Sequence, residues 1–493
     1  MRYFLYLLLL STYHFAISQQ ELIIDLEETI GIAQGEAPVA LIARTRFTNN
    51  YWRYQSFLAD FRPQLSLNST LPDLNRGIDL ITLPDGSDAF VGRSLMTSTV
   101  GIQLGQIIPQ TGGFIFAGTS LRRIDLFKTD LNPKRLSYLS VPLSIGFNQP
   151  LFQNNPFRWE KQIEALQYEE ARQIYVEEHE QIAFDAVNLF FSLYISQLNL
   201  EEAEREKLYA DSLYEISQGR FEVGRIAETD LLQIELRARN AETNLATELL
   251  NYQTANEELR NYLGFRENIN FNLSDPEVLP DYPIDIDLAL EHAKANRSQT
   301  TEFRRRMLEA EMQLDDANRS TGFRVDLRGS FGLSQTGKTI GDAYQSLLDE
   351  ERLALSLQIP IADWGKARSR KEIARSNMDL TRRNIDQDNI NFEREIILKV
   401  QQMELKKRQL DLAGRAFEVA EKRREIAKNR YQIGKIDVTD LNIALNEYDV
   451  SRRSYFQALW DLWTAHYEIR NLTLYDFREG RPLQRNLDEP TLR

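Results

Sequence analysis

The chain has 493 residues, of which 27% are charged, and its formal net charge at pH 7 is -14. An acidic chain of this kind repels phosphates, so no nucleic-acid partner is expected. The chain contains no cysteine, which excludes disulfides, thiolate metal ligands and cysteine nucleophiles.

The first twenty residues, MRYFLYLLLLSTYHFAISQQ, have the pattern of an export signal. Arg2 precedes an apolar run, and small residues at Ala16 and Ser18 favour cleavage after Ser18. A buried first helix is the alternative interpretation. The later sequence holds no apolar run of the roughly 18 residues that a spanning helix needs. We therefore expect residues 1–18 to be a signal peptide and the mature chain to start at Gln19, without a helical anchor.

Alternating apolar and polar residues, the pattern of β-strands, occur in both halves of the chain. Each half has such a segment directly before a proline, at Pro150 and at Pro360. The stretch TVGIQLGQIIPQTGGFIFAGTSL occurs in the first half alone and predicts one extra hairpin near residues 97–123. The alternating apolar positions are Leu65, Leu67, Leu139, Val141, Leu143, Ile145, Phe147, Val325, Leu327, Phe331, Leu333, Leu353, Leu355, Leu357 and Ile359.

Two long segments without proline, residues 157–275 and 361–481, predict long helices. Apolar residues recur in them every three or four positions, as in a coiled-coil seam. A helix from about Phe157 to Gln218 would be on the order of 90 Å long, which exceeds what a globular core requires. The recurring positions include Phe184, Val187, Phe191, Tyr194, Leu198, Leu410, Ala413, Phe417 and Ala420.

One twelve-residue motif interrupts each of these segments. The first copy is RFEVGRIAETDL at residues 220–231, and the second, RYQIGKIDVTDL, lies 210 positions later. Glycine favours a turn between two helices, and threonine and aspartate are good helix-capping residues. We therefore predict two helical hairpins, in which Gly224 and Gly434 end one helix and the Thr-Asp pairs at 229–230 and 439–440 cap the next.

The motif spacing divides the mature chain into two similar halves. Pro150 and Pro360 share the spacing of 210, and LEETIGIAQGEAPVAL resembles IDLALEHAKANRSQTT, which lies 260 positions later. We expect a first repeat with the extra hairpin, a linker, a second repeat and a tail. Their predicted bounds are 19–265, 266–285, 286–475 and 476–493.

Strands with one apolar face fit either a half-buried sheet in a soluble protein or the wall of a membrane barrel. Export, the missing helical anchor and the length of the helices favour the barrel. A sheet in a bilayer must close, because unpaired backbone groups in lipid cost several kcal/mol each. One chain supplies four clear strands, or six with the extra hairpin, and the smallest common barrels need about eight. The barrel should therefore be shared between several chains.

The order of helix, strands, long helix, G-x-I-x-x-T-D-L tip and returning helix, occurring twice, resembles the outer-membrane efflux proteins of the TolC type. The resemblance covers essentially the whole mature chain. It implies a mainly α fold with membrane β: a homotrimer with a shared 12-stranded barrel in outer-membrane lipid and a coaxial α-helical tunnel through the periplasm. A belt of smaller helices would be built from about Arg266 to Asp285 and the tail after Tyr475.

The same resemblance implies a function. Members act in the outer membrane of Gram-negative bacteria as passive exit ducts of tripartite efflux or type I secretion systems. Their partners are a periplasmic adaptor and an inner-membrane pump of the RND or ABC type. The alternative interpretation is a periplasmic coiled-coil scaffold or adaptor protein without a barrel.

The resemblance also implies roles for residues of the two motifs. Tyr431 matches a gate tyrosine, Thr229 and Asp230 match its hydrogen-bonding partners on the other hairpin, and Asp440 matches an acidic ring at the constriction. Two positions depart from the family pattern: Ile436 stands where an arginine is usual, and Ile443 stands where a second acidic residue is usual. The adaptor-binding positions of the tips would be Gly224, Gly434, Ile226, Ile436 and Thr439.

Signs of enzyme chemistry are sparse. The histidines are scattered and none has the helical spacing of a metal pair. Phosphate-binding loops and a serine elbow are missing as well. We expect no catalytic, metal or cofactor site. The four histidines are His14, His179, His292 and His466.

Overall fold

The computed structural model describes residues 20–82, 86–127, 135–267, 269–433, 435–436 and 438–483. They fall into two compact units. The first unit comprises the described residues up to 48, residues 172–297 and those from 390 onward. The second comprises residues 49–171 and 298–389. The expected signal peptide and Gly434 lie outside the described residues.

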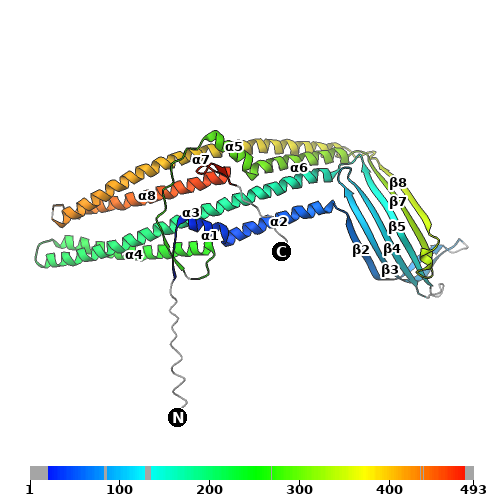
Figure 1. Ribbon diagram of the computed structural model, residues 1–493, viewed down its shortest axis with the longest axis horizontal. Coiled ribbons are helices and arrows are strands. Elements are labelled where there is room, and N and C mark those ends of the chain that lie inside the picture. The colour runs from blue at the N-terminus through cyan, green and yellow to red at the C-terminus, as the bar shows by residue number, and fades with distance from the viewer. Residues whose placement is uncertain are drawn as a thin grey trace, which may run out of the picture. The chain divides into compact units, whose positions relative to one another are not determined.

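The helices have matched lengths in the two halves of the chain (Figure 1). Two have 67 residues, which corresponds to about 100 Å, two have 36 and two have 23. The long helices and both hairpins are thus confirmed. The helices are α1 (Leu26–Gly35), α2 (Pro38–Asp60), α3 (Pro156–Glu222), α4 (Glu228–Leu263), α5 (Ile286–Asn296), α6 (Ser298–Ser320), η1 (Asp342–Tyr344), α7 (Lys366–Gln432) and α8 (Val438–Thr473).

The second unit contains one sheet of six strands in the order β2-β3-β4-β5-β7-β8. Every neighbouring pair in it is antiparallel. The extra hairpin is confirmed as β3 and β4, and it pairs with β2 on one side and β5 on the other. A 12-stranded trimeric barrel requires four strands per chain, whereas this sheet has six. The strands are β2 (Gln64–Thr82), β3 (Asp88–Ile108), β4 (Gly113–Leu126), β5 (Arg135–Leu151), β7 (Arg324–Gly337) and β8 (Leu348–Gln358).

The helical part of the second unit is fastened by ion pairs and stacked rings. The guanidinium of Arg305 in α6 binds Glu170 of α3 through Nε and Nη2 at 2.7 and 3.2 Å. Tyr54 of α2 stacks on Tyr168 of α3 with ring centroids 4.8 Å apart. These contacts hold α6 and α2 against α3 within this unit.

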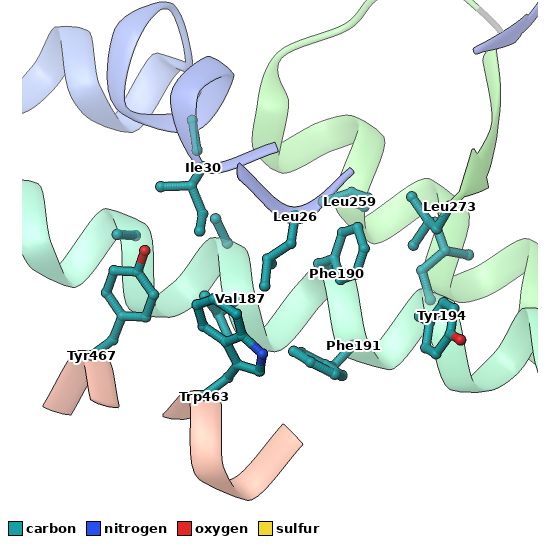
Figure 2. Close-up of a cluster of buried hydrophobic side chains, with 14 of the residues drawn as sticks. Leu26, Ile30, Val187, Phe190, Phe191, Tyr194, Leu259, Leu273, Trp463 and Tyr467 are labelled. Atoms are coloured by element: carbon teal, nitrogen blue, oxygen red, sulfur yellow. The ribbon is translucent and has the colours of Figure 1, made fainter. Parts of the chain in front are cut away.

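The core of the first unit surrounds the middle of α3. Phe190, Phe191 and Leu193 are all fully buried, so this stretch of the helix is covered on most of its circumference. Figure 2 shows side chains from α1, α4 and α8 converging on it. Trp460 of α8 stacks on Phe191 with ring centroids 6.4 Å apart. Burying each large side chain contributes about 1.5–3 kcal/mol, which makes this cluster the main stabilising feature of the unit.

The described residues between α4 and α5, where a linker is expected, are extended, with one short strand. β6 (Ile269–Leu273) pairs in parallel with β1 (Gln20–Ile24). The side chain of Asn256 in α4 binds the backbone of β6 on both sides of residue 270. The expected belt helices at 266–285 are therefore wrong for this segment, because the prolines that follow β6 prevent a helix there. Those prolines are Pro276, Pro280 and Pro283.

The described end of the chain folds back as a tight antiparallel pair, β9 (Tyr475–Asp476) and β10 (Arg481–Pro482). Arg470 of α8 binds Asp476 and Glu180 of α3 at 2.5 and 2.9 Å. This segment is thereby anchored to the core by buried ion pairs. None of the helices among the described residues is long and apolar enough to cross a membrane.

Candidate functional site

The tip of the first hairpin, between α3 and α4, is closed by a Schellman motif. The amide of Gly224 donates to the carbonyl of Phe221, and the amide of Arg225 donates to the carbonyl of Arg220, both at 2.8 Å. Gly224 has a φ of 70°, a left-handed conformation that glycine adopts without a Cβ penalty. The predicted role of Gly224 in ending the helix is confirmed.

The tip of the second hairpin has the same defining bond. The amide of Lys435 donates to the carbonyl of Arg430 at 2.9 Å, five positions back, as in the first tip. Arg430 stands in the last turn of α7 and Arg220 in the last turn of α3, where a positive charge is favoured by the helix dipole. The motif spacing of 210 residues therefore corresponds to the same backbone bond in both tips.

The expected capping by the first Thr-Asp pair is wrong. The N-cap of α4 is Ala227, which makes no side-chain capping bond, so Thr229 and Asp230 lie inside the first turn. The reason is that the helix begins at Glu228, one residue before the pair. In the second hairpin α8 begins at Val438, and Asp440 likewise lies in the first turn. An aspartate there still interacts favourably with the helix dipole.

The second tip contains a buried cluster to which the predicted gate tyrosine belongs. Leu441 is 1% exposed, and Tyr431 and Ile436 pack against its cluster. Tyr209, from α3 of the other hairpin, packs there as well. The pKa of Tyr209 is raised, mainly by burial, with Arg237 lowering it and Tyr431 adding to the rise. The buried members are Ala427, Leu441, Ala444 and Leu445.

The structure thus joins Tyr431 to a residue that the sequence did not indicate. In the described part of the chain, no hydrogen bond links Tyr431 to Thr229 or Asp230, both of which are exposed. Tyr209 has no counterpart in the motif repeat, because Val419 occupies the position 210 residues later. Ile436, at the position of the usual arginine, is half-buried against the cluster and carries no charge.

The first tip has a different interior. Its buried cluster consists of Ala210, Ala238 and Ala241, with Tyr214 beside them. Small side chains let α3 and α4 approach each other closely. The guanidinium Nη2 of Arg237 in α4 binds a Glu206 carboxylate oxygen of α3 at 2.6 Å, which joins the two helices above this seam.

The exposed surface of the tips carries the remaining predicted positions. Thr439 and Asp440 are exposed, whereas Ile226 is half-buried. Ile443 is 44% exposed, although it is apolar. Thr439 and Ile443 are therefore accessible to a neighbouring molecule. Among the residues that the structure describes, no three histidine, aspartate or glutamate side chains gather as a metal site.

One acidic group lies between the two hairpins. Asp449 of α8 is half-buried, and its pKa is raised by burial and then by the charge of Glu202 in α3. Arg453 and Arg452 oppose this rise. Arg452 also donates to the carbonyl of Leu198 in α3 at 2.9 Å, so it connects the second hairpin to the first.

The chain is similar to known proteins in sequence profile and in fold. The profile described as "Outer membrane efflux protein" matches residues 116–265 and 289–473, more than half of the chain. A comparison with curated protein sequences finds no match.

Several solved structures have the same fold. The CmeC outer membrane channel of Campylobacter jejuni is 14% identical, with a TM-score of 0.66 over 94% of this chain and 87% of that chain. The outer membrane protein VceC of Vibrio cholerae is 14% identical, with a TM-score of 0.64 over 93% and 97%. The open MtrE channel of Neisseria gonorrhoeae is 13% identical, with a TM-score of 0.59 over 93% and 91%.

Proposed function

We propose that this chain works as the homotrimeric exit duct of a three-part export machine. The chain belongs to the outer membrane efflux protein family and is therefore an outer-membrane efflux channel. A periplasmic adaptor and an inner-membrane pump of the RND or ABC type would complete the machine. The two structural repeats, 19–265 and 286–475, would each supply one hairpin per chain to the periplasmic tunnel. The family is one of channels rather than enzymes, and the chain would conduct substrates passively.

The observation that carries this proposal is the pair of matched hairpins with the same closing bond. Arg225 and Lys435 each donate to an arginine carbonyl five residues back, 210 positions apart in the chain. Two equivalent tips per chain would give a trimer six tips of similar shape. We assign the glycine of each tip, with Ile226, Ile436 and Thr439, to binding of the adaptor.

We propose that the periplasmic mouth is gated by the second hairpin. Tyr431 packs with Tyr209 and Leu441, so it would hold α7 and α8 against the first hairpin in the closed state. Thr229 and Asp230 are exposed, and we assign them to contacts between copies. Three copies of Asp440 would form an acidic ring at the constriction.

The ring can be tested by ion block in planar bilayers. Screening at physiological salt acts over about 8 Å, so three carboxylates in a narrow mouth should attract multivalent cations. We expect hexamminecobalt(III) to block the wild-type channel from the periplasmic side. The Asp440→Asn variant should need at least tenfold more of this cation for half block. Because Ile443 supplies no second acidic ring, wild-type block should be weaker than in relatives with two rings.

A matched control is available in the other hairpin. Glu228 lies in the first turn of α4 and is exposed, so Glu228→Gln removes one first-turn charge per chain away from the ring. We expect this variant to be blocked like the wild type. Equal block of Asp440→Asn and the wild type would show that Asp440 does not line the constriction. If the wild-type protein forms no channel at all, the proposed function as a duct is wrong.

A further inference from the structure

We propose that three copies of this chain close into a barrel of eighteen strands, formed by pairing the free edge of β8 in one copy with the free edge of β2 in the next. The β3–β4 hairpin would then be part of the membrane wall. This inference rests on the proposed trimer. It concerns how the copies join and how wide the outer-membrane pore becomes.

On one face of the sheet, a row of paired residues is apolar without interruption from β2 to β7. Leu65 pairs with Leu104, which pairs with Ala117, and the row continues through Ile145 to Phe331. The large side chains of this row are 42–71% exposed. Five of the six strands, including both strands of the extra hairpin, contribute one apolar residue to the row, and β8 contributes Glu351. Such a face is covered by lipid in a membrane sheet.

The same apolar face continues to β8. The next row runs from Ile115 to Phe147 and Gly329 and ends at Leu353. Leu353 is 76% exposed. The two rows together place apolar residues of this face on all six strands, including the edge strand β8, while Glu351 opposite Phe331 and Gln106 opposite Ile115 are polar positions on the same face.

The opposite face is polar or small along the neighbouring row. Ser66 pairs with Gln103, which pairs with Gly118, and the row continues through Ser144 to Gly332. Apolar residues on one face and polar or small residues on the other are the pattern of a barrel with lipid outside and water inside. The extra hairpin follows this pattern less strictly, because Phe114 and Phe116 of β4 lie on the polar face, where their rings cover Gly105 and Gly146.

The two edges are complementary. In the described part of the chain, β2 pairs through β3 alone and β8 through β7 alone. Because six consecutive strands alternate in direction, β8 of one copy runs antiparallel to β2 of the next, and the ring closes without a mismatch. The apolar face reaches both edges, since Leu67 is 69% exposed and Leu355 is 67% exposed. Open edges in lipid would leave backbone groups unpaired, at a cost of several kcal/mol each.

The strand number sets the width of the pore. Barrel diameter grows roughly linearly with strand number, so eighteen strands give about 1.5 times the diameter of twelve, and barrels of 16–18 strands leave a water-filled channel. The outer-membrane part would therefore not limit the size of the exported molecule. The narrow part of the duct would be at the hairpin tips.

Cysteine labelling can test whether the hairpin lies in the wall, because the chain has no cysteine of its own. The variants are Ile102→Cys on the apolar face of β3, Gln103→Cys on its polar face and Leu65→Cys on the apolar face of β2. A membrane-impermeant maleimide is added to intact cells. We expect labelling of Gln103→Cys through the pore and at least tenfold weaker labelling of Ile102→Cys and Leu65→Cys.

The other outcomes separate two kinds of failure. If Ile102→Cys is labelled as strongly as Gln103→Cys while Leu65→Cys is protected, the hairpin projects into water and the eighteen-stranded barrel is wrong. If Leu65→Cys is labelled strongly as well, the sheet is not in the membrane and the proposed duct itself is wrong. Cryo-electron microscopy of the unmodified protein in lipid nanodiscs gives an independent count: eighteen strands support the inference, and twelve overturn it.

Discussion

The two helical hairpins have helices of the same lengths and different interiors. α3 and α7 have 67 residues each, α4 and α8 have 36, and both tips close with the same bond. The first tip is packed with alanines and the second with Leu441, Leu445 and Tyr431. Two hairpins can therefore have helices of the same length and the same closing bond while the side chains inside their tips differ. The hairpin with the larger side chains is the one to which we assign the gate.

Positions related by the spacing of 210 show this divergence. Leu231 in the first hairpin is half-buried, whereas Leu441 in the second is 1% exposed. Arg239 is exposed on α4, whereas Asp449 is half-buried against α3. Each pair offers a variant and a control at the same place in the two hairpins.

The largest effect on export is expected from changing the glycine turn at a hairpin tip, which both hairpins share. Gly224→Val places a β-branched residue at a φ of 70°, which costs at least about 1–2 kcal/mol. A Cβ at this site would meet no atom within 4 Å, so the penalty comes from the backbone and the tip must change shape. We expect export to fall to the level of a strain without the protein, while immunoblots show normal amounts in the outer membrane.

Gly219→Val is the matched control for this change. Gly219 lies inside α3 without a left-handed φ, and a Cβ there also has free space. We expect normal efflux from this variant. Normal efflux from Gly224→Val would show that the tip tolerates a reshaped turn and would contradict its assignment to the adaptor.

A smaller effect should distinguish the interiors of the two tips. Leu441→Ala opens a cavity in a packed cluster, for which the typical cost is about 2–5 kcal/mol. Leu231→Ala removes a half-buried side chain and should cost less than about 1.5 kcal/mol. Chemical unfolding of the detergent-solubilised protein, followed by circular dichroism, measures both. Equal losses would mean that a neighbouring copy buries Leu231 in the assembled protein.

The smallest effect concerns the charge between the hairpins. A carboxyl group whose pKa is raised by folding binds its proton more tightly in the folded state, so stability falls as the pH rises through that pKa. The pKa of Asp449 is raised by burial and by Glu202. Asp449→Asn should therefore raise Tm by about 1 °C at pH 7 and have no effect below pH 3.8. Arg239→Gln, at the equivalent position of the first hairpin, should show no such pH dependence of Tm. The same pH dependence in both variants would mean that burial of Asp449 is not its cause.

Much of the fold could be predicted because one motif and one proline spacing occur twice in the sequence. The spacing of 210 located both hairpins, and alternation located the strands, including the extra hairpin. The pairing of β1 with β6 escaped prediction because two five-residue strands, separated by most of the first half, carry too short a pattern. The belt was misplaced because a resemblance gives the order of elements, while prolines such as Pro280 decide locally whether a helix forms.

The site was predicted less completely than the fold. Motif positions indicated Tyr431 and Gly224, but Tyr209 lies outside the motif, and the sequence does not show which faces of two distant helices meet. The Thr-Asp pair has the composition of a cap, yet Ala227 occupies the cap position. Threonine and aspartate near a helix start therefore locate the first turn of the helix, but they do not show which residue is the N-cap.

The buried cluster around Phe190 sets the order of events during biogenesis. It collects side chains from Ile24 in β1 to Ile469 near the end of α8, so almost the whole chain must be present before it can close. Contacts between segments so distant in sequence form late, because closing long loops is entropically costly. During export the aromatic residues of α3 emerge long before α8 can cover them. A periplasmic chaperone that holds exposed aromatic segments would protect the chain in that interval.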